Sequence, residues 1–159
     1  MKKIILLTAI SFTLTGCMSL KTEMVNAKGD FKNCEATGGG LGLGAVVGVA
    51  LAAASRSSCV TNQKSIGFLE VDSAGTLDIN FSTQGDAVLT VSESNVKDIL
   101  EGDRILEVDH NTVTTPEEFQ SAAFGPIDKP VEIKLTRADL ILEKTAGRTR
   151  IQKTKTATN

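Results

Sequence analysis

Apolar and polar residues alternate over short stretches in the C-terminal part of the 159-residue chain. A period of two residues is typical of strands that bury one face and expose the other. Turn-forming Gly, Asp, Asn and Ser residues separate these stretches. The pattern predicts strands over residues 66–71, 77–81, 87–91, 104–108, 131–135 and 140–142. It therefore indicates a small β-rich domain.

One short helix interrupts this series of strands. Thr115 precedes Pro116, and Glu118 stands three positions after Thr115. A Thr at the N-cap, a Pro at the first helical position and a Glu at the third form a capping box. We expect a helix that continues to about Phe124, where Gly125 and the proline after it end it.

The N-terminus has a different pattern. Lys2 and Lys3 precede an apolar stretch over residues 4–14, which is typical of a signal peptide and too short to span a bilayer as a helix. Residues 14–17, Leu-Thr-Gly-Cys, resemble a bacterial lipobox. The resemblance implies that residues 1–16 are removed and that Cys17 carries the lipid. Met rather than Asp at position 18 favours the outer membrane, so we expect an anchored protein that faces the periplasm.

Cys34 and Cys59 form an even pair in the oxidising compartment that a signal peptide implies. Their spacing excludes a compact CxxC redox or zinc motif, and one His cannot complete a Cys/His metal site. We therefore expect a disulfide that closes residues 34–59, and no metal site.

The segment between these cysteines is uncharged over residues 38–54 and rich in Gly and Ala. At helical spacing it has a stripe of small residues, the pattern that lets apolar helices approach closely in membranes. The stripe consists of Gly40, Gly44, Gly48 and Ala52. A straight helix here would be about 25 Å long and would stretch the residues that flank it under the disulfide. This favours a bent or two-piece segment packed on the domain, and insertion in a bilayer or oligomer is the alternative.

A longer motif carries a family resemblance. Residues 102–109 read Gly-Asp-Arg-Ile-Leu-Glu-Val-Asp and are followed by Val113, the capped helix and a strand that ends at Arg137. This order resembles the PDZ domain in its permuted bacterial form, over about residues 66–143. The fold class that follows is α+β and β-rich. It is a PDZ-like, small, partly open barrel with one capped helix, preceded by the disulfide-closed Gly/Ala-rich segment.

The resemblance implies that the domain binds extended peptides by strand addition, usually at their C-terminal ends. Residues 65–68, Ser-Ile-Gly-Phe, are similar to the loop whose backbone N–H groups hold the terminal carboxylate. The next residue would begin the strand that pairs with the ligand, and one helix face would line the groove. The positions carried over in this way are Ile66, Gly67, Phe68, Leu69, Phe119, Ala122 and Ala123.

Composition limits the chemistry. The chain has no Trp or Tyr and one His, which excludes paired-histidine catalysis and base-stacking surfaces. We therefore expect no enzyme, no cofactor and no nucleic-acid partner. Charge is uneven: residues 144–159 carry five basic residues and no acid, whereas all 19 acidic residues lie before them. We expect this basic end to be disordered, and docking on anionic lipid or glycan, or on the acidic body of the domain, is the alternative.

The chain thus divides into five predicted parts: a signal peptide (1–16), a lipidated tether (17–33), the disulfide-closed segment (34–59), a PDZ-like domain (60–143) and the basic tail (144–159). The function expected is that of a membrane-anchored periplasmic adaptor that binds extended or C-terminal segments of other envelope proteins. The alternative is a structural lipoprotein whose glycine stripe drives homo-oligomerisation or membrane association.

Overall fold

A computed structural model of the chain describes residues 18–40, 43–82 and 88–151. The predicted signal peptide and Cys17 lie outside these residues. The chain divides into two compact units. Unit 1 consists of residues 1–22 and 34–60, and unit 2 of residues 23–33 and 61–159.

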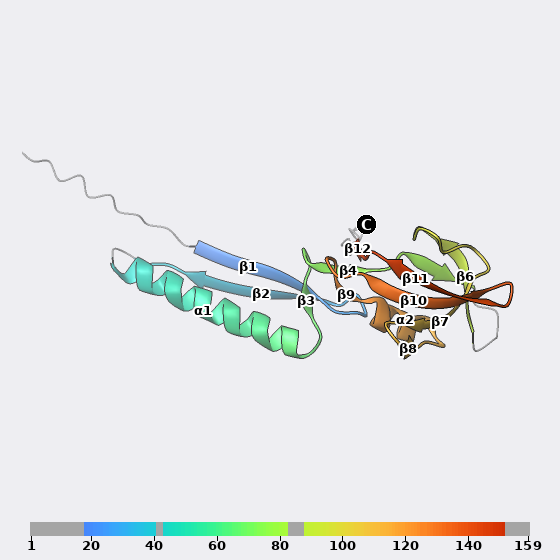
Figure 1. Cartoon of the computed structure of the whole chain (residues 1–159). Coiled ribbons are helices and arrows are strands. Elements are labelled where there is room, and N and C mark those ends of the chain that lie inside the picture. The colour runs from blue at the N-terminus through green and yellow to red at the C-terminus, as the bar shows by residue number, and fades with distance from the viewer. Residues whose placement is uncertain (1–17, 41–42, 83–87, 152–159) are drawn as a thin grey trace, which may run out of the picture. The chain divides into compact units, whose positions relative to one another are not determined.

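Unit 1 is built from a β-hairpin and one long helix (Figure 1). The strands β1 (Met18–Val25) and β2 (Phe31–Gly38) are neighbours in one sheet, and α1 (Leu43–Ser65) lies alongside them. The predicted disulfide is confirmed, because Cys34 of β2 and Cys59 of α1 are bonded with their Cα atoms 5.7 Å apart.

The helix α1 is continuous, so the expected bent or two-piece segment is wrong. It begins at Leu43 rather than Gly38, and Cys59 lies inside it rather than beyond its end. From Leu43 to Cys59 a helix rises about 24 Å, and an extended chain from Cys34 to Leu43 reaches about 30 Å. The disulfide can therefore join a strand and a helix that run side by side.

Glycines permit close contact between β2 and α1. A Cβ added at Gly38 would overlap the carbonyl oxygen of Gly48, and a Cβ at Gly48 would lie 2.7 Å from the carbonyl oxygen of Gly39. Ala52, one turn further along α1, is buried on the same face. A Cβ at Gly44 would meet nothing within 4 Å. Part of the small-residue stripe is thus used inside unit 1.

The stripe is also shorter than the sequence pattern suggests, since Gly40 precedes the helix. Among the residues that the structure describes, neither helix has both the length and the hydropathy needed to cross a membrane.

A matched pair of glycine variants tests this packing. We expect Gly48→Ala to lower the free energy of unfolding by about 1–3 kcal/mol, because its Cβ would press on the backbone of Gly39, the residue after β2. Gly44→Ala should raise it by about 0.5–1 kcal/mol, since Ala favours the helix and open space surrounds the site. Urea unfolding of the full chain, followed by circular dichroism, measures both. Equal effects of the two variants would contradict the packing of Gly48 against β2.

Unit 2 contains the remaining strands and one short helix. The strands are β3 (Leu69–Glu70), β4 (Ala74–Thr76), β5 (Ile79–Phe81), β6 (Leu89–Ser94), β7 (Arg104–Val108), β8 (Asn111–Thr112), β9 (Gly125–Pro126), β10 (Val131–Arg137), β11 (Leu140–Ala146) and β12 (Thr149–Arg150). The helix is α2 (Pro116–Ala123). One sheet has the order β11-β10-β7-β6-β5 with β8 paired to β7, a second has the order β12-β4-β9, and β3 pairs with the end of β1.

The core of unit 2 joins α2 to the largest sheet. Phe119 and Ala123 of α2 belong to one cluster of buried residues with Ile105, Ile133 and Leu135 of the sheet. The predicted β-rich class is confirmed. The sheets are open, because β5 and β11 are the two edges of the largest sheet and do not pair with each other. The expected partly open barrel is therefore corrected. The one capped helix expected after the Gly/Ala-rich segment is α2, and a second helix, α1, covers much of that segment.

The capping box that the sequence predicts is confirmed at α2. Thr115 accepts a hydrogen bond from the N–H of Glu118, and the Glu118 carboxylate accepts hydrogen bonds from the N–H groups of Thr114 and Thr115. The bond from the Thr114 N–H is the main reason that the pKa of Glu118 lies below its ordinary value. Local sequence therefore sets the direction in which α2 begins.

Two predicted boundaries are wrong. Residues 18–33, expected to be a tether, contain all of β1 and the start of β2, because Met24 and Val25 are buried and pair with β3. The tail expected from residue 144 begins inside β11, and residues 149–150 form β12. Residues 152–159 lie outside the described part of the chain.

Candidate functional site

Ile66, Gly67 and Phe68 end α1 instead of forming a carboxylate-binding loop. The Phe68 N–H donates to the carbonyl oxygen of Gln63 at 3.0 Å, and the Gly67 N–H donates to that of Lys64 at 3.2 Å. With Gly67 at φ +87°, these bonds form a Schellman motif. The Ile66 N–H also donates to Gln63, at 3.2 Å. The three N–H groups are thus occupied and are not presented to a ligand carboxylate.

The other predicted ligand contacts are divided between different places. Leu69 opposes Val25 in the β1–β3 pair, so the strand it begins has a partner within the chain. On α2, Ala123 is fully buried in the core. Ala122 lines an open hollow with Val113 and the outer side of α2. Only Phe119 lies where the resemblance places it, at a groove.

This groove, of about 250 Å³, lies between the β4–β5 segment and the N-terminal half of α2. Its lining residues are Thr76, Leu77, Ile79, Asn80, Phe81, Pro116, Phe119 and Gln120. The rings of Phe81 and Phe119 meet edge to face, with centroids 4.7 Å apart. Leu77 and Ile79 are buried, whereas Asn80 and Gln120 are exposed. The groove therefore has an apolar floor and an uncharged polar rim.

The strand β5 presents an open edge to this groove. The N–H of Asn95 donates to the carbonyl oxygen of Asp78, and the N–H of Ser82 donates to that of Thr90. The backbone groups of residues 78, 80 and 82 thus face β6. Because these directions alternate, the backbone groups of Ile79 and Phe81 face away from β6. In the described part of the chain β6 is the one strand that pairs with β5.

The strand β4, which precedes β5, is paired on both edges. Thr76 opposes Thr149 of β12, and Gly75 opposes Gly125 of β9. The N–H of Ile127 also donates to the carbonyl oxygen of Ser73. Among the described residues, backbone groups without a strand partner therefore lie at β5 and not at β4.

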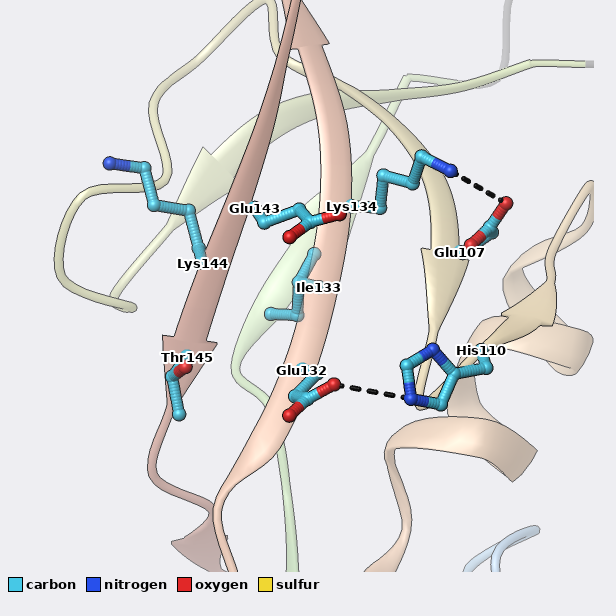
Figure 2. A pocket seen from close by; sticks show the side chains of 8 residues that line it. All are labelled: Glu107, His110, Glu132, Ile133, Lys134, Glu143, Lys144 and Thr145. Atoms are coloured by element: carbon cyan, nitrogen blue, oxygen red, sulfur yellow. Dashed lines mark hydrogen bonds and ion pairs between the residues drawn. The ribbon is translucent and has the colours of Figure 1, made fainter.

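A second hollow, of about 180 Å³, lies over the outer face of β7, β10 and β11. Figure 2 shows two pairs of side chains in this hollow: Lys134 Nζ lies 3.2 Å from Glu107 Oε1, and His110 Nε2 lies 3.3 Å from Glu132 Oε2. Glu143 and Lys144 also line it. Among the described residues, no group of three or more His, Cys, Asp or Glu side chains is arranged to hold a metal ion.

The groove residues Thr76, Asn80, Pro116 and Gln120 were missed in the sequence analysis. The available signal was the alternation of Leu77, Ile79 and Phe81, which predicts one apolar face on that strand. The resemblance predicts a ligand-binding loop at residues 65–68, but the Ile-Gly-Phe pattern there also suits the end of a helix.

Comparison with models of protein families, with curated proteins and with solved structures finds no match to this chain. The groove and the N-terminal pattern are therefore the features that bear on function.

Proposed function

We propose that this chain is a lipid-anchored protein of the bacterial envelope that binds an extended segment of another protein along the open edge of β5. The observation that carries the proposal is the combination of an unpaired strand edge with an apolar groove beside it. In strand addition, the main-chain hydrogen bonds supply affinity and the alternate side chains enter pockets that supply specificity. The resemblance of residues 66–143 to a permuted PDZ domain supports the same mode.

The ligand we propose is an internal segment rather than a free C-terminus. A terminal carboxylate needs several convergent N–H donors, and the expected donors at residues 66–68 bind the end of α1. The edges of β4 are occupied by β9 and β12. The edge over Ile79 and Phe81 has the length for a short stretch of extended chain that continues past the groove at both ends.

The anchor is proposed on Cys17 and the lipobox resemblance of residues 14–17. More than one acyl chain on this residue would give durable membrane attachment. The membrane proposed is the outer membrane, with the β5 groove in the periplasm, because position 18 is Met.

Titration of a library of extended peptides into the full-length protein in detergent tests the groove. We expect a subset to bind, with equal affinity when the C-terminal carboxylate is amidated. Gln120→Trp, which fills the groove, should weaken binding at least about tenfold, because interface energy is concentrated at a few central contacts. The matched control is Ser121→Trp, which lies on the opposite hollow and should leave affinity unchanged within about twofold.

If no peptide of the library binds, the proposed function is wrong. Equal weakening by the two Trp variants would place the peptide elsewhere. A requirement for the free carboxylate would overturn the preference for internal segments.

A further inference from the structure

The described residues at one end of unit 1 carry no charge. Residues 18–20, 36–40 and 43–55, which form the start of β1, the end of β2 with the residues after it, and more than half of α1, are all uncharged. Next to this end, β1, β2 and α1 each carry a charged side chain, namely Lys21, Glu35 and Arg56. Lys21 Nζ lies 3.5 Å from Glu35 Oε1, and Arg56 Nε donates a hydrogen bond to Thr22 Oγ1. Unit 1 thus has an uncharged end and a charged boundary.

The uncharged end exposes large apolar side chains on α1. Val46, Val47 and Leu51 are 69%, 59% and 67% exposed. Gly48 and Ala52 mark the face that packs on β2. At about 100° per residue, Val46 and Val47 lie on the far side of the helix from that face, and Leu51 borders it. From Ser55 onward the exposed positions of the helix are mainly polar. The exposed surface of α1 therefore changes from apolar to polar along the helix axis, in addition to differing between its faces.

We propose that this uncharged end of unit 1 lies in the interfacial layer of a phospholipid membrane. Cys17, the proposed lipidated residue, is covalently adjacent to Met18, and β1 begins at this end. The acyl chains would hold Val46, Val47 and Leu51 at the bilayer surface, where an exposed apolar face is buried among headgroups and acyl chains. The inference rests on the proposed anchor and is independent of the β5 groove.

The charged boundary supports this orientation. Lys21, Glu35 and Arg56 would remain on the water side of the interface, where long charged side chains are stable. We place the helix at the interface rather than across the bilayer, because no helix in the described part of the chain is both long and apolar enough to cross.

A second copy of the chain is less suited than a membrane to cover this face. The apolar part of α1 over residues 43–54 is about 18 Å long and about 10 Å wide, so it offers roughly 180 Å². A stable protein interface usually needs about 800 Å² from each partner. A lipid surface has no such minimum area.

Photolabelling of the full-length, lipidated protein in vesicles of phosphatidylethanolamine and phosphatidylglycerol tests the inference. The vesicles contain a phospholipid with a diazirine on its acyl chain, and adducts are mapped by mass spectrometry. We expect adducts on residues 43–54 to exceed those on Leu140 and Ile141 at least about fivefold, as apolar insertion requires. These two side chains are the matched control, since they are 67% and 63% exposed on unit 2.

The double variant Val47→Asp, Leu51→Asp should lose most adducts on α1 and keep the Cys34–Cys59 disulfide, whose formation reports folding. The same spectra show whether Cys17 carries lipid. Lipid on Cys17 without adducts on α1 would overturn the inference and leave the anchor intact. Adducts on α1 without lipid on Cys17 would support the membrane contact of α1 and remove the proposed anchor as its cause. Absence of both, equal labelling of Leu140, or cross-links between two copies of α1 without lipid adducts would each overturn the inference.

Discussion

Replacement of Asp103 by Ala is expected to lower the free energy of unfolding by about 3 kcal/mol, because it removes a buried charge that several donors hold. Asp103 is fully buried. Its carboxylate accepts hydrogen bonds from Arg137 Nε at 2.7 Å and Nη2 at 2.8 Å, and from the N–H of Leu100 at 2.8 Å. Arg137 Nη2 also donates to the carbonyl oxygen of Asp98. The network joins the turn before β7 to the end of β10.

Urea unfolding of the full chain measures this effect. Asp98→Asn is the matched control, because Asp98 hydrogen-bonds Arg137 through its backbone carbonyl oxygen, whereas its carboxylate acts on Arg137 through its charge alone. Asn also tolerates the φ of +65° at this position. The control should stay within about 0.5 kcal/mol of the wild type. Similar losses from Asp103→Ala and Asp98→Asn would show that the buried pair has no special role.

The Asp103 network also predicts a pH dependence. Hydrogen bonds from Arg137, and then from the Leu100 N–H, hold the pKa of Asp103 below its ordinary value despite burial. Because this pKa is lower in the folded than in the unfolded protein, the ionised carboxylate stabilises the fold. This stabilisation is complete above the unfolded-state pKa of about 4 and is lost as the pH falls through the folded-state pKa. The difference in free energy of unfolding between the wild type and Asp103→Ala should therefore narrow as pH falls below about 4. A constant difference down to pH of about 2 would contradict this assignment.

The second large effect is expected at Arg148, which lies in the segment that the sequence assigned to a disordered tail. Its guanidinium is buried. Nε donates to the carbonyl oxygen of Ala123 at 2.7 Å, Nη1 to that of Lys129 at 2.8 Å, and Nη2 to Asp109 Oδ2 at 3.2 Å. Arg148 thus binds the last carbonyl of α2, the following loop and the turn after β7.

We expect Arg148→Ala to lower the free energy of unfolding by about 3 kcal/mol, since it leaves buried carbonyl groups without donors. Arg148→Lys should recover part of this loss, because an ammonium group cannot reproduce the planar arrangement of five N–H donors. Arg150→Ala is the control: Arg150 is exposed in β12, and its loss should cost less than about 0.5 kcal/mol. Thermal or urea unfolding of the three variants gives the ranking, and equal stability of Arg148→Ala and Arg150→Ala would contradict the role of Arg148.

Arg148 also shows why a charge pattern is a poor guide to order. The basic residues after position 143 have no acidic neighbours in sequence, which is typical of a solvated tail. The partners of Arg148 lie 18 to 39 positions earlier. Gly75 and Gly125 leave room for its side chain, because a Cβ at either position would lie 2.8 Å from Arg148 atoms. Neither fact can be read from the local sequence.

Gly67 makes the same point for the candidate site. The stretch Ile-Gly-Phe suits a loop that presents N–H groups, and it equally suits a helix that ends at a left-handed glycine. The choice depends on whether the preceding residues are helical. The long helix α1 supplies carbonyl acceptors at Gln63 and Lys64, and the N–H groups bind them. The candidate groove therefore lies beside β5 and not at residues 65–68.

The sequence by itself determined the features that depend on neighbouring residues or on the count of a residue type. These features are the Thr115 capping box, the Cys34–Cys59 pair and the alternation that gives a β-rich domain. Cap chemistry, the pairing of the two remaining cysteines and the period of the pattern can each be recognised without knowledge of distant contacts. Tertiary structure alone decided the continuous helix α1, the burial of Arg148 and the open edge of β5. Each of these depends on which distant backbone groups are already paired, and that depends on the whole fold.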